Sequence, residues 1–165
     1  MVASKLLGVV SIFMIVNYAA GNGQCVASIR GTSRCPPAWS QWQDKCYKMH
    51  DAYVTLEEGK EICVEMGGVM VVPQSKEELQ QLLNMFSVQR FWIGCNDVET
   101  EGTWECLDEG TIEVQNEMWA DGEPNNDYAN ELCAVGSASG LHDVSCYPSE
   151  KLICQRPVAP ALLLL

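Results

Sequence analysis

The sequence predicts an α+β domain that is held together by disulfides. Two amphipathic segments with helix-start signals occur early in the chain, and short apolar runs typical of strands follow them. Nine cysteines occur in 165 residues, and the stretch from Cys106 to Cys133 is rich in Gly, Asn, Asp and Glu. Helices that precede strands favour an α+β arrangement. A long irregular stretch in a small domain is usually functional.

The first 21 residues have the layout of a secretory signal peptide. Lys5 precedes an apolar run over residues 6–16, and small residues at 19–21 favour cleavage after Gly21. A retained membrane anchor is the alternative, although the run is too short to span a bilayer comfortably. We therefore expect a secreted, extracellular protein that does not insert into membranes. The remaining chain divides into a tail over residues 22–34, a folded domain over residues 35–157 and a C-terminal tail over residues 158–165.

The charge of the chain excludes some partners. The formal net charge is −12, because 22 acidic residues outnumber 10 basic ones. Nucleic acid and anionic membranes are poor partners, since their phosphates repel such a surface. Cations, or neutral polar ligands held through cations, fit it better.

The cysteines of this chain predict disulfides rather than a zinc site. No CxxC pair occurs, and the histidines are limited to His50 and His142. An odd number of cysteines leaves one thiol over. Cys25 stands apart near the N-terminus, so we expect it to be free for a disulfide-linked homodimer. A thiol capped by a small molecule and a different intrachain pairing are the alternatives.

Two hairpins are predicted, each closed by a disulfide. The first covers residues 35–49 and joins Cys35 to Cys46. The second pairs FWIGC with TWEC, which places Cys95 opposite Cys106. Cross-strand neighbours lie close enough for such a bond. A final apolar strand is KLICQ. The aromatic residues that we expect in the core are Trp39, Tyr47, Trp92, Trp104 and Trp119.

Two helices are predicted from capping boxes. In this motif the N-cap hydroxyl accepts from the backbone N–H of a glutamate three residues later, and the glutamate carboxylate accepts from the N-cap N–H. Thr55 and Glu58 open a helix that runs to about Met66, where two glycines end it. Ser75 and Glu78 open a second one. Its buried stripe is expected to be Leu79, Leu82, Leu83 and Phe86.

An acidic and amide-rich cluster lies between residues 122 and 146. Carboxylate and amide oxygens are the ligands that Ca²⁺ prefers, whereas Mg²⁺ demands stricter geometry. A loop that folds back on itself would bring these oxygens to one cation, although the spacing is not that of an EF-hand. A solvated acidic loop is the alternative. The four candidate ligands are Glu123, Asn125, Glu131 and Asp143.

Several motifs together resemble a C-type lectin-like domain that extends from Cys35 to Cys154. They are FWIG at 91–94, EGTW at 101–104, GEPNN at 122–126, HDVSC at 142–146 and ICQ at 153–155. The resemblance implies two helices, small antiparallel sheets and a long calcium-binding loop. It also implies the pairs Cys35–Cys46, Cys63–Cys154 and Cys133–Cys146, whereas Cys95–Cys106 follows from the predicted hairpin.

The resemblance implies calcium-dependent carbohydrate binding, in innate defence or agglutination. The triplet Glu123-Pro124-Asn125 is similar to the version that favours mannose, fucose, glucose or N-acetylglucosamine, whose vicinal hydroxyls replace waters on the calcium. The family's calcium ligands also contact the sugar. They match Glu123, Asn125, Glu131 and Asp143, together with the position of His142.

His142 departs from the pattern of the family, which usually has asparagine before this aspartate. A histidine nitrogen is a poor calcium ligand, although its N–H can donate to a sugar hydroxyl. Three outcomes are open: calcium kept with a water in place of the lost oxygen, weak calcium binding without sugar, or neither.

Two further interpretations remain. An auxiliary calcium site of some relatives matches Asp97, Glu101, Asn126 and Glu131, but Leu132 occupies another of its ligand positions. A lectin-like fold that binds protein, mineral or ice is the alternative function. We expect no enzyme, because no nucleophile and base are placed together.

Overall fold

The computed structural model describes residues 35–107, 111–112 and 116–159. Its helices are α1 (Leu56–Glu65), α2 (Lys76–Phe86) and the short 3-10 turn η1 (Asp127–Ala129). Its strands are β1 (Ser40–Trp42), β2 (Lys45–Val54), β3 (Val69–Met70), β4 (Arg90–Asn96), β5 (Trp104–Cys106), β6 (Thr111–Ile112), β7 (Cys133–Ser137), β8 (Gly140–Val144) and β9 (Glu150–Pro157). The predicted signal peptide, Cys25 with its homodimer, and most of the C-terminal tail lie outside the described residues.

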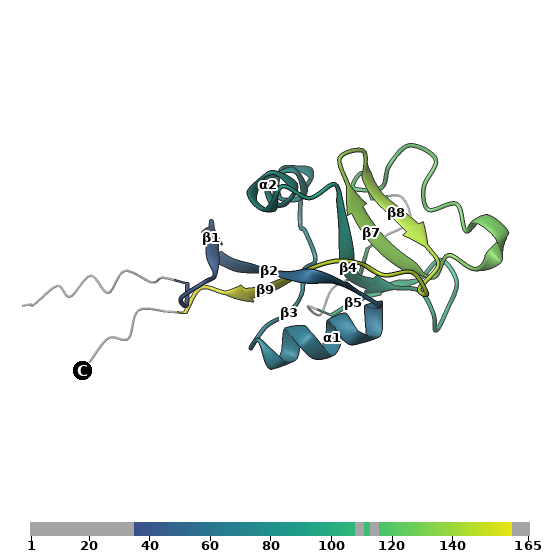
Figure 1. Ribbon diagram of the computed structural model, residues 1–165. Helices are drawn as coiled ribbons and strands as arrows, with labels where there is room; N and C mark the ends of the chain where they lie inside the picture. Colours follow the sequence, from purple (N-terminus) through teal and green to yellow (C-terminus); the bar gives the residue numbers. More distant parts are fainter. Residues whose placement is uncertain (1–34, 108–110, 113–115, 160–165) are drawn as a thin grey trace, which may run out of the picture. The chain divides into compact units, whose positions relative to one another are not determined.

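The strands form two groups that are antiparallel within themselves. In the first, β2 pairs with β1 and β9, and β9 pairs with β3. In the second, β4 pairs with β5 and β7, β5 with β6, and β7 with β8. A parallel pairing of β4 with β9 joins the groups, where Phe91 lies opposite Lys151. In Figure 1 the β2–β9 pair runs between α1 and α2. The predicted α+β fold with two helices and small antiparallel sheets is confirmed.

The helices begin where their caps predict. The Thr55 hydroxyl accepts from the Glu58 N–H, and the Glu58 carboxylate returns to the Thr55 N–H at 2.9 Å. Ser75 likewise accepts from the Glu78 N–H at 3.1 Å. The Glu78 carboxylate instead accepts from the Gln74 N–H at 2.8 Å and from a buried tyrosine hydroxyl. The predicted capping box at α2 is therefore only half formed, because the Glu78 carboxylate binds these other partners.

The partners of Glu78 come from β2. Tyr47 donates its hydroxyl to Glu78 Oε1 at 2.6 Å, and Lys45 Nζ lies 3.0 Å from the same oxygen. Glu78 is 3% exposed, so the paired ammonium offsets the cost of burying its charge. Burial, followed by the bond to Glu78, strongly raises the pKa of Tyr47. This network ties α2 to the β2–β9 pair.

The buried aromatic residues join the sheets to the helices. Tyr47, Trp92, Trp104 and Trp119 are each at most 5% exposed, as predicted. Trp39 is only half-buried, with the Arg156 guanidinium 5.7 Å from its ring centre. The four leucine and phenylalanine positions of the predicted α2 stripe pack on the core cluster.

Four disulfides join cysteines of the described residues, and their pairs are the predicted ones. They are Cys35–Cys46, Cys63–Cys154, Cys95–Cys106 and Cys133–Cys146. Cys95 and Cys106 lie directly opposite each other in the β4–β5 register. The prediction from hairpin geometry and the structure agree at this bond.

The β7–β8 hairpin is the main element that the sequence did not reveal. No strand is predicted for residues 133–144, where glycine, alanine and serine interrupt the apolar pattern. In the structure β7 is almost wholly buried between β4 and β8. Small residues suit this position, since a Cβ on Gly136 would lie 2.7 Å from Leu79 Cδ1.

Candidate functional site

The loop that precedes residue 123 is tied to β8 by its backbone. The Ala120 N–H donates to the Leu141 carbonyl at 2.9 Å, and the Leu141 N–H donates to the Met118 carbonyl at 2.8 Å. Gly140 has φ +137°, and a Cβ there would lie 2.8 Å from Ala120 N and Met118 O. Glycine therefore allows the hairpin and the loop to approach this closely.

The buried carboxylate of Asp143 binds the backbone of the next part of the loop. This side chain is 3% exposed. Its Oδ1 accepts from the Asn125 N–H at 3.0 Å, and its Oδ2 accepts from the Asn126 N–H at 2.6 Å. The Glu123–Pro124 peptide that leads into this stretch is cis. One carboxylate of β8 thus orders the residues that follow the proline.

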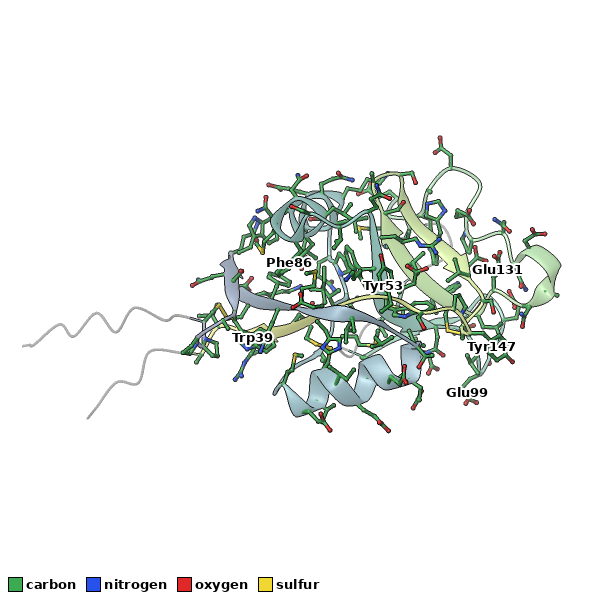
Figure 2. The ribbon with its side chains drawn as sticks, in the orientation of Figure 1. Trp39, Tyr53, Phe86, Glu99, Glu131 and Tyr147 are labelled. Carbon is green, nitrogen blue, oxygen red and sulfur yellow. A yellow bond between two sulfur atoms is a disulfide. The ribbon has the colours of Figure 1, made fainter. Side chains whose placement is uncertain are left out.

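Glu131 closes the loop at its far end. Its N–H donates to Asn126 Oδ1 at 3.2 Å, and its Oε2 accepts from the Asp127 N–H at 2.8 Å. These bonds span η1 and return the chain to β7. Figure 2 shows Glu131 on this loop beside the β7–β8 hairpin.

His142 links Glu123 to the turn of the hairpin. Its Nδ1 lies 3.1 Å from Glu123 Oε1, and its Nε2 lies 2.8 Å from Ser139 Oγ and 3.1 Å from Ser137 Oγ. An ionised carboxylate only accepts, so the neutral ring carries its proton on Nδ1 and Nε2 accepts from a serine. Glu123 also receives a bond from Asn125 Nδ2 at 2.7 Å.

Burial and neighbouring acids disfavour the charged forms of two carboxylates at the site. Burial, together with the neighbouring Asp143, raises the pKa of Glu123, while His142 acts in the opposite direction. Asp97 directly follows β4 and is 2% exposed. Burial is the main reason that the pKa of Asp97 is raised, and Asp143 adds to the effect. A cation placed among these groups would favour their charged forms.

The predicted site residues surround one open cleft with a volume of about 370 Å³. All five residues of the main predicted set line it: Glu123, Asn125, Glu131, His142 and Asp143. The cleft also has four lining residues that sequence reasoning missed: Arg90, Asp127, Ser137 and Val144. Asp127 could have been found as an acid within the loop. Arg90 and Ser137 carried no signal, because strand pairing alone brings them here.

The donor set of this cleft fits calcium. Within the described residues, no three His, Cys, Asp or Glu side chains have the arrangement of a metal centre. Calcium also uses amide and backbone oxygens, and it accepts irregular geometry. The cleft offers the carboxylates of Glu123, Glu131 and Asp143 beside the Asn125 amide. His142 binds Glu123 and the serines through its two ring nitrogens, so it fits a supporting role better than a ligand role.

The auxiliary set is only partly assembled. Asp97 Oδ2 accepts from the Gly102 N–H at 2.8 Å, while its buried Oδ1 has no hydrogen-bond partner. Asn126 bonds Asp143 and Glu131, as described above. Glu101 lies exposed in the turn between β4 and β5. The orphaned oxygen of Asp97 is the feature that fits a second cation.

The relatives of this chain are lectins. It is 35% identical over 129 residues to C-type lectin domain family 4 member M of Symphalangus syndactylus, with 76% of this chain and 30% of the relative covered. It is 34% identical to CD209 antigen of the same species, with 76% of this chain and 33% of the relative covered. The chain thus spans about a third of the length of these curated relatives.

The relatives correct the predicted localisation. C-type lectin domain family 4 member M and CD209 antigen are type II transmembrane receptors, so the prediction of a secreted, extracellular protein is wrong. The prediction of cleavage rested on the signal-peptide layout of residues 1–21 and on the shortness of the apolar run at residues 6–16, with a retained anchor as the alternative. The described residues include no helix that is long and apolar enough to cross a membrane.

Solved structures share the fold. The carbohydrate-recognition domain of the mouse scavenger receptor C-type lectin has a TM-score of 0.67 and 29% identity, and the match covers 76% of this chain and all of that one. The C-type carbohydrate-recognition domain of cow CD23, solved in the presence of a GlcNAc2Man3 oligosaccharide, has a TM-score of 0.69 and 26% identity. That match covers 77% of this chain and 98% of that one.

The family model for the Lectin C-type domain matches residues 52–156, which include both helices and the whole loop. Domains of this family generally bind Ca²⁺ and are generally not enzymes. The match covers more than half of the chain, and the fold and the curated relatives agree with it. The chain therefore belongs to the family of C-type lectin domains.

Proposed function

We propose that this domain binds carbohydrate through one calcium ion held in the cleft between the long loop and β8. The observation that carries the proposal is the convergence of Glu123, Asn125, Glu131 and Asp143 on one open cleft. The ion would be held by these four residues and would supply coordination positions for two vicinal sugar hydroxyls. The alternative of a solvated acidic loop fits poorly, because Asn125 donates its side-chain amide to Glu123 and its backbone N–H to Asp143.

We propose a preference for sugars of the mannose, fucose and N-acetylglucosamine type. Glu123 offers an acceptor and Asn125 an amide donor to the two hydroxyls. The order of these two groups across Pro124 sets which hydroxyl geometry fits. Each sugar buries few atoms in an open cleft, so we expect a Kd of about 1 mM for a monosaccharide.

His142 acts in this proposal through Glu123. It donates to Glu123 Oε1 and is held by the serine hydroxyls of the hairpin turn. The carboxylate is thereby oriented before the ion and the sugar arrive, which lowers the cost of ordering it on binding. Among the three outcomes for His142, this geometry supports calcium and sugar binding with the ligand oxygen of asparagine replaced by water.

Retention on immobilised sugar tests the proposal. The protein should be retained on mannose resin in calcium, released by chelator, and poorly retained on galactose resin. The double variant Glu123→Gln/Asn125→Asp reverses the order of donor and acceptor, so its retention should move towards galactose.

Asp121→Asn is the matched control, because Asp121 is an exposed acid of the same loop that does not line the cleft. Its retention should equal that of the wild type. Retention that ignores chelator would contradict calcium dependence. A correctly folded protein that binds neither calcium nor sugar would favour the alternative, a lectin-like domain with a protein, mineral or ice ligand.

A further inference from the structure

A second cleft adjoins the candidate sugar site. It has a volume of about 650 Å³ and is predominantly polar. Arg90 and Ser137 line both clefts, so the two clefts share a boundary at these residues. The remaining lining residues of the second cleft are Tyr53, Ser87, Val88, Gln89, Glu150 and Lys151.

Strand pairing builds this cleft from three strand ends. Arg90 at the start of β4 lies opposite Ser137 at the end of β7. Lys151 near the start of β9 lies opposite Phe91. Directly opposed residues of paired strands lie about 5 Å apart. Arg90 and Lys151 therefore both belong to strands of the sheet, which fix side-chain positions better than a loop does.

The two cations of the cleft have partners in the protein, and both can still interact with a ligand. Arg90 pairs through Nη2 with Glu150, whose side chain is 7% exposed, while the Arg90 side chain is 49% exposed. A guanidinium has five N–H donors, so its exposed edge can still donate. Lys151 Nζ donates to the Asp51 carbonyl and lies 4.6 Å from the centre of the Tyr53 ring.

The charge of this cleft differs from that of the chain. Its lining holds two cations and one buried carboxylate, whereas the chain carries a net −12. Among the described residues, no carboxylate lies within 4.0 Å of Lys151 Nζ. The carboxylates of the first cleft would oppose an anion, and a bound calcium ion would reduce that opposition.

We propose that the second cleft is a subsite for an anionic sugar residue, carrying a carboxylate or a sulfate, next to the sugar bound in the first cleft. This inference rests on the proposed function, because the first cleft must hold the neighbouring sugar. Lys151 supplies the unpaired charge, and Arg90 supplies directed N–H donors at the boundary of the two clefts. The domain would therefore select the second sugar residue of a glycan as well as the terminal one.

Three disaccharides with a terminal α-mannose test the subsite. They differ in the second residue, which is neutral mannose, a mannose 6-sulfate or a mannuronate. Titration calorimetry in calcium at low ionic strength should show roughly three- to fivefold tighter binding of an anionic form, as one partly exposed ion pair provides. The advantage should fall with added salt. The sulfate and uronate arms identify the anionic group.

Lys151→Gln should remove the advantage while leaving the affinity for the neutral disaccharide within about twofold, which also shows that the site is folded. Lys76→Gln is the matched control, because Lys76 is an exposed lysine at the start of α2 and lines neither cleft. We choose Lys151 because Arg90→Gln would leave Glu150 buried and unpaired.

The outcomes separate the two proposals. Equal affinities for all three disaccharides, or an advantage that survives in Lys151→Gln, would overturn the subsite and leave the proposed function standing. Failure of the wild type to bind even the neutral disaccharide in calcium would overturn the proposed function and, with it, the subsite.

Discussion

The half of the domain around β2, β9 and the helices and the half around the long loop are stabilised by different interactions. The first buries large apolar side chains such as Tyr47, Leu82 and Ile153, and its charged residue Glu78 has a lysine partner. The second is ordered by bonds between carboxylates and backbone N–H groups, with Asp143 at its centre.

This difference has a consequence for function. Apolar burial needs no ligand, so the first half is complete by itself. In the second half, burial and the neighbouring Asp143 raise the pKa of Glu123, which costs free energy until a cation binds beside the carboxylates. The scaffold should therefore be insensitive to calcium, and the loop should depend on it.

The largest expected effect is on the scaffold. Replacing Cys63 and Cys154 by alanine removes a disulfide with a sequence separation of 91, which should lower the free energy of unfolding by about 4.6 kcal/mol. Urea unfolding under non-reducing conditions measures this. The pair Cys95 and Cys106, with a separation of 11, should cost less, about 3 kcal/mol by the same argument. An equal or larger loss for the shorter pair would contradict it.

The contact between hairpin and loop comes next. Gly140→Ala should cost about 2 kcal/mol and weaken the calcium response, because its Cβ meets two backbone atoms at 2.8 Å and its φ is +137°. Gly122→Ala is the matched control. Gly122 has φ +89° and nothing within 4 Å of an added Cβ, so only the conformational cost of about 1 kcal/mol applies. Thermal unfolding of both variants, with and without calcium, measures the two losses of stability and the calcium response.

Asp143→Asn should affect the loop half alone. Removing one carboxylate of the proposed set should weaken calcium binding by roughly tenfold or more, and the calcium-dependent rise in the unfolding midpoint should shrink accordingly. In chelator the midpoint should also fall, because the amide oxygen can accept only one of the two N–H bonds and the amide nitrogen leaves the other N–H unpaired. Calorimetric titration of calcium gives the affinity, and an unchanged affinity would exclude Asp143 as a ligand.

The smallest effect concerns pH, and its sign differs between the halves. The raised pKa values of Glu123 and Asp97 mean that the folded state binds protons more readily, so their contribution to stability is lost as pH rises through those values. The lowered pKa of Glu58 on α1 contributes stability that is lost as pH falls. In chelator, lowering the pH from neutral towards 5 should raise the unfolding midpoint slightly.

Calcium provides the control for the pH prediction. With the acids of the loop neutralised, the rise in midpoint towards pH 5 should vanish or reverse, because protons then compete with the ion. Glu58→Gln should leave the rise in chelator intact. A midpoint in chelator that falls steadily from neutral pH to pH 5 would contradict the opposite signs.

Much of the scaffold could be predicted from short stretches of sequence. The caps at Thr55 and Ser75 placed both helix starts, and the spacing of Cys95 and Cys106 placed a hairpin register. The β7–β8 hairpin was missed because Gly136 and its small neighbours show no apolar alternation. The resemblance to C-type lectins supplied the pairs Cys63–Cys154 and Cys133–Cys146.

The sequence by itself determined the helices, two hairpins and the chemistry of the loop, because caps, periodicity and cross-strand spacing act over a few residues. Tertiary structure alone decided which distant residues these polar side chains meet. It placed Glu78 against Tyr47, turned His142 towards Glu123, and set Arg90 opposite Ser137. These partners lie between 19 and 47 positions apart in the chain, so they meet only when strand register and core packing bring them together.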